Sequence, residues 1–329
     1  MRSGSNGDQP GLIVVVDTEE EFDWDAPFSR AATSVSHIAE IGRLQAICDR
    51  HGVRPAYLVD YPVATDPLSL GALRPLIASG RALVGAHLHP WVSPPYEEEV
   101  SSRNSYPGNL PPSLEREKLA RLADAIEQGF GVRPRMYKAG RYGLGPNSFA
   151  ILEELGFSVD LSPSPPFDYS ADGGPDYTRR GLAPRWEGPS RSVLSIPGTG
   201  ALVGSAASLR LYEVLTALPL RRLRAPAIGA KLGLVERIKL SPEGHSAEEM
   251  ARLVRALLAR GQRLFVLTLH SPSVVPGHTP YARTEAERDA LLTALDDLLG
   301  RFMSEFGGRA TDPLAVHAEA LGRRAKARR

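Results

Sequence analysis

The stretch GLIVVVD, residues 11–17, decides the fold class. Its apolar residues follow one another without polar alternation, which predicts a strand buried on both faces. Further short apolar runs, each bounded by turn residues, predict six more strands: 54–60, 82–90, 133–140, 157–162, 192–198 and 263–271. Strands of this type are typical of parallel sheets covered by helices.

Helical patterns separate these runs. Apolar residues recur at spacings of three and four over 34–52, 113–131, 146–157 and 246–262, and Ser246 stands three residues before Glu249, a capping-box pattern. Alternating strands and helices predict right-handed βαβ units and a parallel sheet. Seven or eight units can close into a barrel, and an open doubly wound sheet is the alternative. No G-x-G-x-x-G follows the first strand, which disfavours a dinucleotide-binding sheet.

Residues 199–245 depart from this rhythm. The segment is rich in Leu, Ala and Arg, and we expect a helical insertion before the last strand. It would lie over the barrel rim or form a partner surface, through which an oligomer could assemble. The whole chain, 1–329, is otherwise expected to be a single α/β barrel domain.

Composition narrows the class of protein. The net charge of +1 gives no argument for nucleic acid or an anionic membrane as partner. No run approaches the roughly 18 apolar residues of a membrane span, and residues 1–10 lack the apolar region of a signal peptide. A cytoplasmic protein is therefore expected. Cys48, the single cysteine, lies on an apolar helical face and is expected to be a buried structural thiol.

The predicted strand ends carry chemically capable side chains. They are Asp17 and Glu19 after strand one, His87 and His89 at strand three, Lys138 and Arg141 near strand four, Asp160 in strand five and His270 in the last strand. In a parallel α/β barrel the reactive groups lie at the carboxyl ends of the strands. These residues are therefore expected to meet at one rim.

A metal site is the most specific prediction. His87 and His89 share the i, i+2 relation, so on a strand both imidazoles point to one face. Asp17 and Glu19 are related in the same way, and a buried carboxylate needs a partner or a metal. One carboxylate and two histidines with an open position are the ligands of a catalytic zinc or related divalent site. The alternatives are rim histidines that hold a loop and a solvated acidic run.

Three further residues have two interpretations each. His270 could be a third ligand or a general acid, and Asp160 is a candidate to hold its tautomer. Arg141 could pair with Asp17 and keep it ionised. A purely structural salt-bridging role is the alternative for Asp160 and Arg141.

The ordered set resembles the NodB-type polysaccharide deacetylases, carbohydrate esterase family 4, and is most similar to the WalW-like branch. The resemblance runs from about Leu12 to Tyr281 and rests on VDTEEEFDW, HLHPW, AGRYG, SVDLS and LTLHSPS, in that order. It implies a distorted (β/α)7 barrel. Asp17-x-Glu19 replaces the family's adjacent aspartates, and the histidine spacing of two is shorter than the family's four. Glu19 is our choice of third ligand, with Asp17 and Asp23 as alternatives.

The resemblance also implies a mechanism and a substrate. A divalent metal, Zn²⁺ or else Co²⁺, Mn²⁺ or Ni²⁺, would be held by His87, His89 and Glu19. Asp17 would act as base, held by Arg141, and His270 as acid, held by Asp160. A backbone N–H near Tyr142 would stabilise the oxyanion. The substrate would be an N-acetylated saccharide, and the candidates for stacking against a sugar ring are Trp24, Trp91 and Tyr142.

Two other functions remain open. A barrel that binds carbohydrate without catalysis would need neither metal nor turnover. An amidohydrolase acting on another C–N bond would also use an H-x-H pair in a barrel. That family places the pair on its first strand, whereas here it is on the third, which disfavours this alternative.

Overall fold

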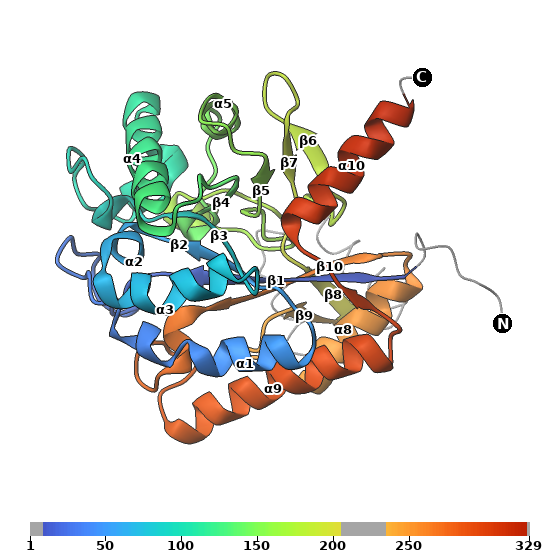
Figure 1. Cartoon of the computed structure of the whole chain (residues 1–329). Helices are drawn as coiled ribbons and strands as arrows, with labels where there is room; N and C mark the ends of the chain where they lie inside the picture. The colour runs from blue at the N-terminus through green and yellow to red at the C-terminus, as the bar shows by residue number, and fades with distance from the viewer. Residues whose placement is uncertain (1–8, 205–234, 328–329) are drawn as a thin grey trace, which may run out of the picture.

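The computed structural model describes residues 9–204 and 235–327. Seven parallel strands curl into an incomplete barrel in the order β10-β1-β2-β3-β4-β5-β7 (Figure 1). They confirm the seven predicted strands, all but β1 shorter than the apolar run: β1 Gly11–Thr18, β2 Ala56–Val59, β3 Leu83–Leu88, β4 Met136–Ala139, β5 Val159–Asp160, β7 Val193–Ser195 and β10 Leu264–His270. Two short strands extend the sheet, β6 Arg185–Glu187 antiparallel to β7 and β11 Arg309–Ala310 parallel to β1.

Helices surround the curled sheet (Figure 1). In the described residues these are α1 Gly42–Arg50, α2 Tyr61–Thr65, α3 Pro67–Ala78, α4 Pro112–Phe130, α5 Ser148–Glu154, α8 Ala247–Ala259, α9 Glu285–Ser304 and α10 Pro313–Ala327. The capping box of Ser246 and Glu249 opens α8 as predicted. Gly131 ends α4 with a φ of 72°, a conformation that a residue without a Cβ adopts freely.

Strand alternation divides the core into two layers. Leu12, Val14 and Val16 of β1 belong to the large cluster between sheet and helices. Ile13 and Val15 belong to a smaller cluster inside the curl. The same parity holds on β3, where Val84, Ala86 and Leu88 pack against helices. Residues of the opposite parity therefore point into the barrel.

Gly85 shows how tightly the interior is filled. A Cβ at this position would lie 2.4 Å from Leu58 Cδ2 and 2.8 Å from Met136 O. Only glycine lets β3 approach its neighbours at this level. On β3, inward side chains therefore stand on either side of Gly85: Leu83 toward the amino end and His87 toward the carboxyl end.

The gap between β7 and β10 is bridged by a hairpin. Strands β8 Gly200–Gly204 and β9 Val235–Lys239 pair antiparallel. At the base of this hairpin, Thr199 N donates to Val266 O at 3.1 Å and Thr268 N donates to Leu240 O at 3.1 Å. The residues at the two ends of the hairpin, Thr199 and Leu240, are thus hydrogen-bonded to β10 and close the gap on that side of the barrel.

This hairpin corrects part of the expectation for 199–245. At both described ends of that segment the chain is strand, not helix. The middle of the predicted helical insertion, 205–234, lies outside the described residues.

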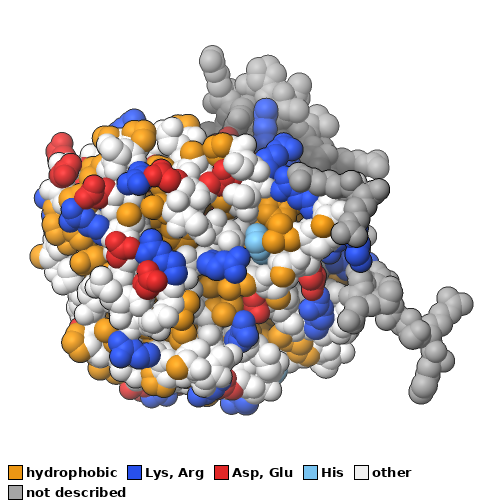
Figure 2. Space-filling model, turned by 45° about the horizontal axis from the view of Figure 1, so that its top comes forward, with side chains coloured by type: hydrophobic (Ala, Val, Ile, Leu, Met, Phe, Trp, Pro, Cys, Tyr) orange, Lys and Arg blue, Asp and Glu red, His pale blue; other side chains and the backbone are white. Residues whose placement is uncertain are grey.

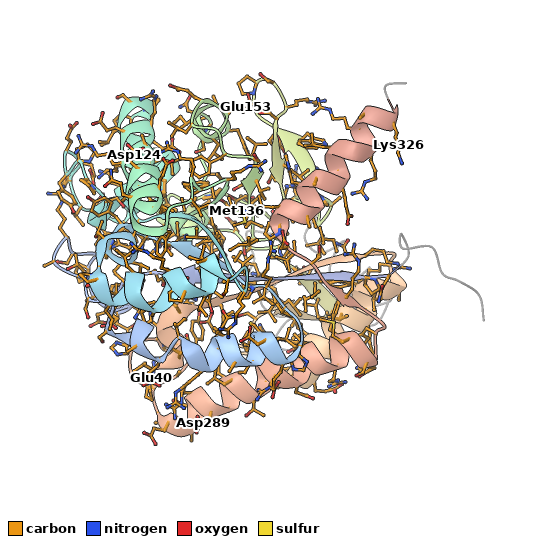
Figure 3. The ribbon with its side chains drawn as sticks, viewed as in Figure 1. Glu40, Asp124, Met136, Glu153, Asp289 and Lys326 are labelled. Atoms are coloured by element: carbon orange, nitrogen blue, oxygen red, sulfur yellow. The ribbon has the colours of Figure 1, made fainter. Side chains whose placement is uncertain are left out.

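Charged side chains on the outer helices lie at the surface. Figure 3 places Glu40, Asp124, Asp289 and Lys326 at the periphery of the molecule and Met136 in its interior. Figure 2 shows basic and acidic side chains interspersed over one face, without a large field of one sign.

Cys48 is fully buried, as expected. Among helices of the described ranges, none has both the length and the apolar character needed to cross a membrane.

Candidate metal and catalytic site

Strands β10, β1, β3 and β4, four of five consecutive strands in the sheet, deliver polar side chains into the mouth of the barrel. Asp17, His87, Lys138 and His270 all have the inward parity of their strands. The sheet register places Asp17 beside His270 and His87 beside Lys138. Strand order and parity alone therefore gather these groups at the carboxyl end of the sheet, as the sequence predicted.

They line a pocket of about 470 Å³. This volume is within the range of small-molecule sites. Its floor is polar and its walls are largely aromatic. The walls include Phe22, Trp24, Phe28, Tyr106, Tyr142, Phe167, Tyr169 and Tyr281.

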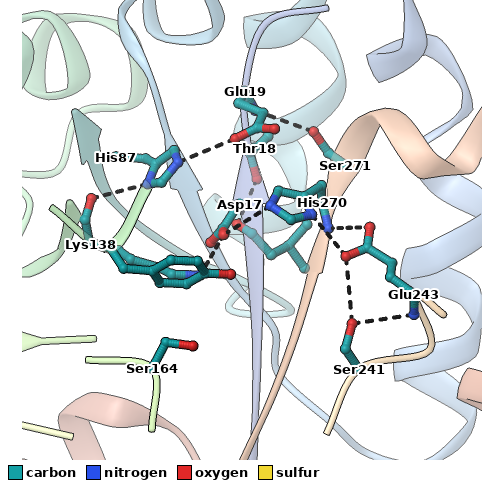
Figure 4. Close-up of polar contacts among 12 residues, drawn as sticks. Asp17, Thr18, Glu19, His87, Lys138, Ser164, Ser241, Glu243, His270 and Ser271 are labelled. Atoms are coloured by element: carbon teal, nitrogen blue, oxygen red, sulfur yellow. Dashed lines mark hydrogen bonds and ion pairs between the residues drawn. The ribbon is translucent and has the colours of Figure 1, made fainter. Parts of the chain in front are cut away.

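Glu19, His87 and His89 form a compact donor group. Nε2 of His87 lies 3.2 Å and Nε2 of His89 lies 3.5 Å from Oε2 of Glu19. All three side chains are about 3% exposed, and one ligand atom from each lies within 4.8 Å of the others. Figure 4 shows Glu19 facing His87 above Asp17 and His270.

The other nitrogen of each histidine fixes its tautomer. Nδ1 of His87 donates to the carbonyl oxygen of Lys138 at 3.0 Å, and Nδ1 of His89 contacts Oε2 of Glu20 at 2.7 Å. Burial lowers the pKa of both imidazoles to about 4, so they are neutral at pH 7. With Nδ1 donating to a carbonyl oxygen, Nε2 of His87 presents a lone pair toward Glu19. Nε2 of His89 does the same when Glu20 is ionised and accepts from Nδ1. This is the arrangement of metal-binding histidines, whose second nitrogen is held by an oxygen acceptor.

A divalent cation fits this donor group. Oε1 of Glu19 is buried and has no hydrogen-bond partner, and burial raises the pKa of its carboxyl to about 7. A cation would compensate the desolvated charge and satisfy the oxygen. Two imidazoles and one carboxylate with space toward a pocket are the donor set of an open, catalytic site.

A second group of potential ligands, Glu20, Asp60 and His89, fits less well. It uses Nδ1 of His89, which already bonds to Glu20. Burial raises the pKa of Glu20 to about 8 and that of Asp60 well above its ordinary value. Neither carboxyl lines the pocket. Asp60 instead accepts from Glu20 N at 2.6 Å and caps α2 through Val63 N at 2.8 Å, so this group supports His89 from behind.

Asp17 is held ionised by Lys138. The two side chains form a buried ion pair through Asp17 Oδ2. Burial alone would raise the pKa of Asp17, but the charges of Lys138 and the protonated His270 outweigh it and hold the pKa below the usual range. Oδ1 of Asp17 is buried and has no partner. It is therefore an ionised acceptor at the floor of the pocket.

His270 is held protonated by Glu243. Nδ1 of His270 lies 2.8 Å from Oε2 of Glu243, and Nε2 lies 3.6 Å from Oδ2 of Asp17 (Figure 4). Burial would lower the pKa of His270, but the charges of Glu243, Glu19 and Asp17 raise it to about 9. The imidazolium thus carries a proton at Nε2 within the pocket at neutral pH.

The expected pairing of Arg141 with Asp17 is wrong. Arg141 follows β4 at a left-handed φ of 52°, beyond the point where strand parity directs side chains. Its guanidinium donates to Ser105 Oγ at 2.6 Å and lies 3.4 Å from Asp172 Oδ2. The cation that pairs with Asp17 is Lys138, three residues earlier and pointing inward.

The expected pairing of Asp160 with His270 is also wrong. Val159 and Leu161 belong to the interior cluster, so Asp160 between them points away from the barrel mouth. Its carboxylate accepts from Ser162 N at 3.0 Å and from Ser195 Oγ at 2.8 Å. Asp160 ties β5 to β7, and Glu243 has the role that the sequence analysis gave to Asp160.

The aromatic candidates separate into two groups. Trp24 and Tyr142 line the pocket. The ring of Trp24 lies edge-on to His270 at 5.2 Å. Trp91 does not line the pocket, because it is 1% exposed and stacks on His89 at 4.3 Å. It therefore supports the ring of His89 from behind.

Ser271, His37 and Glu21 form a chain of hydrogen bonds behind Glu19. Nδ1 of His37 lies 3.0 Å from Glu21 Oε1, Nε2 lies 2.7 Å from Ser271 Oγ, and Glu19 N donates to the same Oγ at 3.3 Å. The order resembles that of a hydrolytic triad. Ser271 is 0% exposed, however, and does not line the pocket, so this chain positions the backbone of Glu19.

Sequence reasoning placed Lys138 at the rim but gave it no role, and it missed His37 and Glu243. A lysine within a buried strand needs a buried partner, which was the available signal for the role of Lys138. His37 lies within the helical pattern of 34–52, and nothing in the sequence marked it as a site residue. Glu243 lies in the loop SPEG after β9, within the segment expected to be helical, and only the tertiary fold brings it to His270.

Comparisons with known proteins support the fold. No protein-family model matches the chain, and no curated protein matches it. Among solved structures, a Mycobacterium smegmatis protein described as a polysaccharide deacetylase superposes with a TM-score of 0.57 at 14% identity, over 97% of this chain and 93% of that one. The PuuE allantoinase gives 0.56 at 15% identity, over 96% and 92%.

A third solved structure matches this chain over a much smaller share of its own length. The 4-alpha-glucanotransferase from Thermococcus litoralis gives a TM-score of 0.52 at 10% identity, over 93% of this chain but 39% of that one. At these identities the likeness concerns the fold alone. The chain therefore has the distorted (β/α)7 barrel fold of NodB-type polysaccharide deacetylases.

Proposed function

We propose that this protein is a divalent-metal-dependent hydrolase that removes N-acetyl groups from an amino-sugar-containing saccharide. The observation that carries the proposal is the meeting of Glu19, His87 and His89 with the pair Asp17 and His270 in one pocket. The fold shared with a protein described as a polysaccharide deacetylase supports it.

The metal would be held by Nε2 of His87, Nε2 of His89 and the carboxylate of Glu19. When bound, a divalent cation would polarise the acyl carbonyl and lower the pKa of a water molecule. Zn²⁺ is our first choice for two imidazoles and a carboxylate, with Co²⁺, Mn²⁺ and Ni²⁺ as alternatives.

Asp17 and His270 divide the proton transfers. Oδ1 of Asp17 is ionised and without a partner, so it would accept the proton of the attacking water. His270 is protonated, and its Nε2 would give a proton to the departing amine. Lys138 keeps Asp17 ionised and Glu243 keeps His270 charged, so each group is ready at pH 7.

Trp24 and Tyr142 would contact the sugar. Both present ring surface to the pocket, and aromatic faces stack against the apolar faces of sugar rings. The backbone N–H of Tyr142, in a turn with a φ of 62°, is the proposed additional donor to the oxyanion.

Acetate release tests the proposal. Metal-loaded protein is incubated with chitin oligosaccharides and other N-acetylated saccharides, and acetate is measured. We expect release that chelator and His89→Ala abolish. Asp17→Asn should lower release by about 10²- to 10⁴-fold while metal content is retained. Absence of bound metal and of turnover on the whole panel would favour a carbohydrate-binding barrel.

A second candidate is hydrolysis of a different C–N bond by the same groups. The PuuE allantoinase has nearly the same structural similarity as the M. smegmatis protein. Allantoin therefore belongs in the panel, with loss of allantoin as the measurement. Turnover of allantoin without acetate release from any saccharide would replace the first proposal with the second.

A further inference from the structure

Three aromatic rings stand in a row along one wall of the pocket. Tyr142 stacks on Tyr169 with centroids 5.0 Å apart and planes inclined by 25°, and Tyr169 stacks on Phe167 at 6.4 Å and 24°. All three rings line the pocket. The row begins at the proposed reacting groups, because Lys138 Nζ, which pairs with Asp17, lies 5.1 Å from the centroid of Tyr142.

Two cations of β9 lie over this row. Arg237 and Lys239 are two residues apart, so they share one face of the strand. Lys239 Nζ lies 4.7 Å from the centroid of Tyr142 and donates to its hydroxyl. The guanidinium carbon of Arg237 lies 5.4 Å from the centroid of Phe167. We call Tyr142, Tyr169, Phe167, Lys239 and Arg237 the aromatic–cation row.

These two cations have no carboxylate partner within the described residues. The carboxylates that line the pocket are each engaged elsewhere: Asp17 with Lys138, Glu19 with the two histidines, Glu243 with His270 and Asp172 with Arg141. Glu236, beside Arg237 on the strand, pairs with Arg252. Lys239 is half-buried and lines the pocket, so its charge faces space that a ligand would fill.

We propose that the aromatic–cation row binds a negatively charged sugar unit next to the N-acetylated one. The proposal rests on the proposed function, which places the N-acetyl group over Asp17 and His270. The rings form an apolar wall against which a sugar can pack, while Lys239 and Arg237 supply charge-assisted hydrogen bonds to a carboxylate or phosphate. A neutral glycan would use the rings but leave both cations without a counter-charge. The substrate class is therefore an acidic saccharide.

Calorimetric binding with defined probes tests this proposal. The probes are a hyaluronan tetrasaccharide, which carries carboxylates, neutral chitotetraose, and N-acetylglucosamine 1-phosphate compared with N-acetylglucosamine. We expect the hyaluronan probe to bind about tenfold more tightly than chitotetraose, as for a hydrogen bond to a charged group. Lys239→Met should remove most of this preference and Arg237→Met a part of it. Lys326→Met, an exposed position on α10, is the matched control and should change neither affinity.

The outcomes separate the two proposals. A preference for an anionic probe that depends on Lys239, with no acetate release from any saccharide, supports binding of an acidic sugar by the aromatic–cation row and contradicts the deacetylase function. Dependence on Lys239 for the phosphate probe alone identifies phosphate as the recognised group. Equal affinity for charged and neutral probes, or an equal loss of both in Lys239→Met, overturns the proposal even if acetate is released.

Discussion

Glu243 contacts His270 twice, through Nδ1 at 2.8 Å and through the backbone N–H at 2.9 Å. The contact joins the loop after β9 to the end of β10, so the hairpin that bridges the barrel also supplies the partner of the proposed acid. It explains why His270 stays charged in a buried setting, where desolvation by itself would lower its pKa.

Glu243→Gln should lower the pKa of His270. The folded pKa of about 9 exceeds the ordinary 6.5, so the charge pair stabilises the native state fully below about pH 6.5. That stabilisation is lost as pH rises through about 9. The difference in unfolding free energy between the native protein and Glu243→Gln should therefore shrink over this window, as measured by urea denaturation at a series of pH values.

The pH dependence of acetate release should show the same lowering of the His270 pKa in Glu243→Gln. If His270 is the acid, the alkaline limb of acetate release should move to lower pH in Glu243→Gln. Asp160→Asn is the matched control, since Asp160 contacts Ser162 and Ser195 and not His270. A shift of the alkaline limb in Asp160→Asn and none in Glu243→Gln would contradict the assignment.

Metal affinity should rise with pH through about 7. Burial raises the pKa of Glu19 to about 7, whereas His87 and His89 lose their protons near 4. A cation must displace the proton of Glu19, so affinity should fall about tenfold per pH unit below 7 and level off above it. Zn²⁺ titration of chelator-treated protein measures this dependence. Glu19→Gln should bind weakly at every pH, and an unchanged affinity in that variant would remove Glu19 from the site.

Strand parity explains how much of this site the sequence could predict. A continuous apolar run such as 11–17 predicts a buried strand, and Asp17 at its end must face either the barrel mouth or the helices. His87 and His89 could be assigned to one face because they are two residues apart. The meeting of these ends followed from parallel strands alone.

The two wrong pairings show where that reasoning stops. Val159, Asp160 and Leu161 are all buried, so the alternation of apolar and polar residues here does not mark a solvent-exposed face, and the sequence could not tell which layer Asp160 faces. Arg141 follows the strand in a left-handed turn, whereas Lys138 lies within it. Glu243 belongs to a loop whose position depends on long-range pairing of β9 with β8. Side chains on loops and beyond strand ends are placed by tertiary contacts that no local pattern encodes.

Lys138→Met should destabilise the protein strongly. The variant leaves the carboxylate of Asp17 buried, 3% exposed, without its cation. Removing one partner of a buried ion pair costs about 3–5 kcal/mol. Urea denaturation in the presence of chelator should show this loss. The double variant Asp17→Asn, Lys138→Met should recover part of it, because no unpaired charge remains. A loss no larger than that of the exposed Lys326→Met would show that the pair is not buried in solution.

Ser271→Ala should weaken the proposed metal site without changing any of its proposed ligands. Ser271 Oγ accepts from Glu19 N and bonds to His37 Nε2, so the variant leaves two buried groups unsatisfied, at a cost of about 1–3 kcal/mol each. Since the backbone of Glu19 loses its anchor, Zn²⁺ affinity should fall together with the unfolding free energy. Ser304→Ala, which removes an exposed hydroxyl that bonds to Gly300 O within α9, is the matched control. A Ser271→Ala protein that is less stable but binds Zn²⁺ with unchanged affinity would show that this chain of hydrogen bonds supports the fold and not the site.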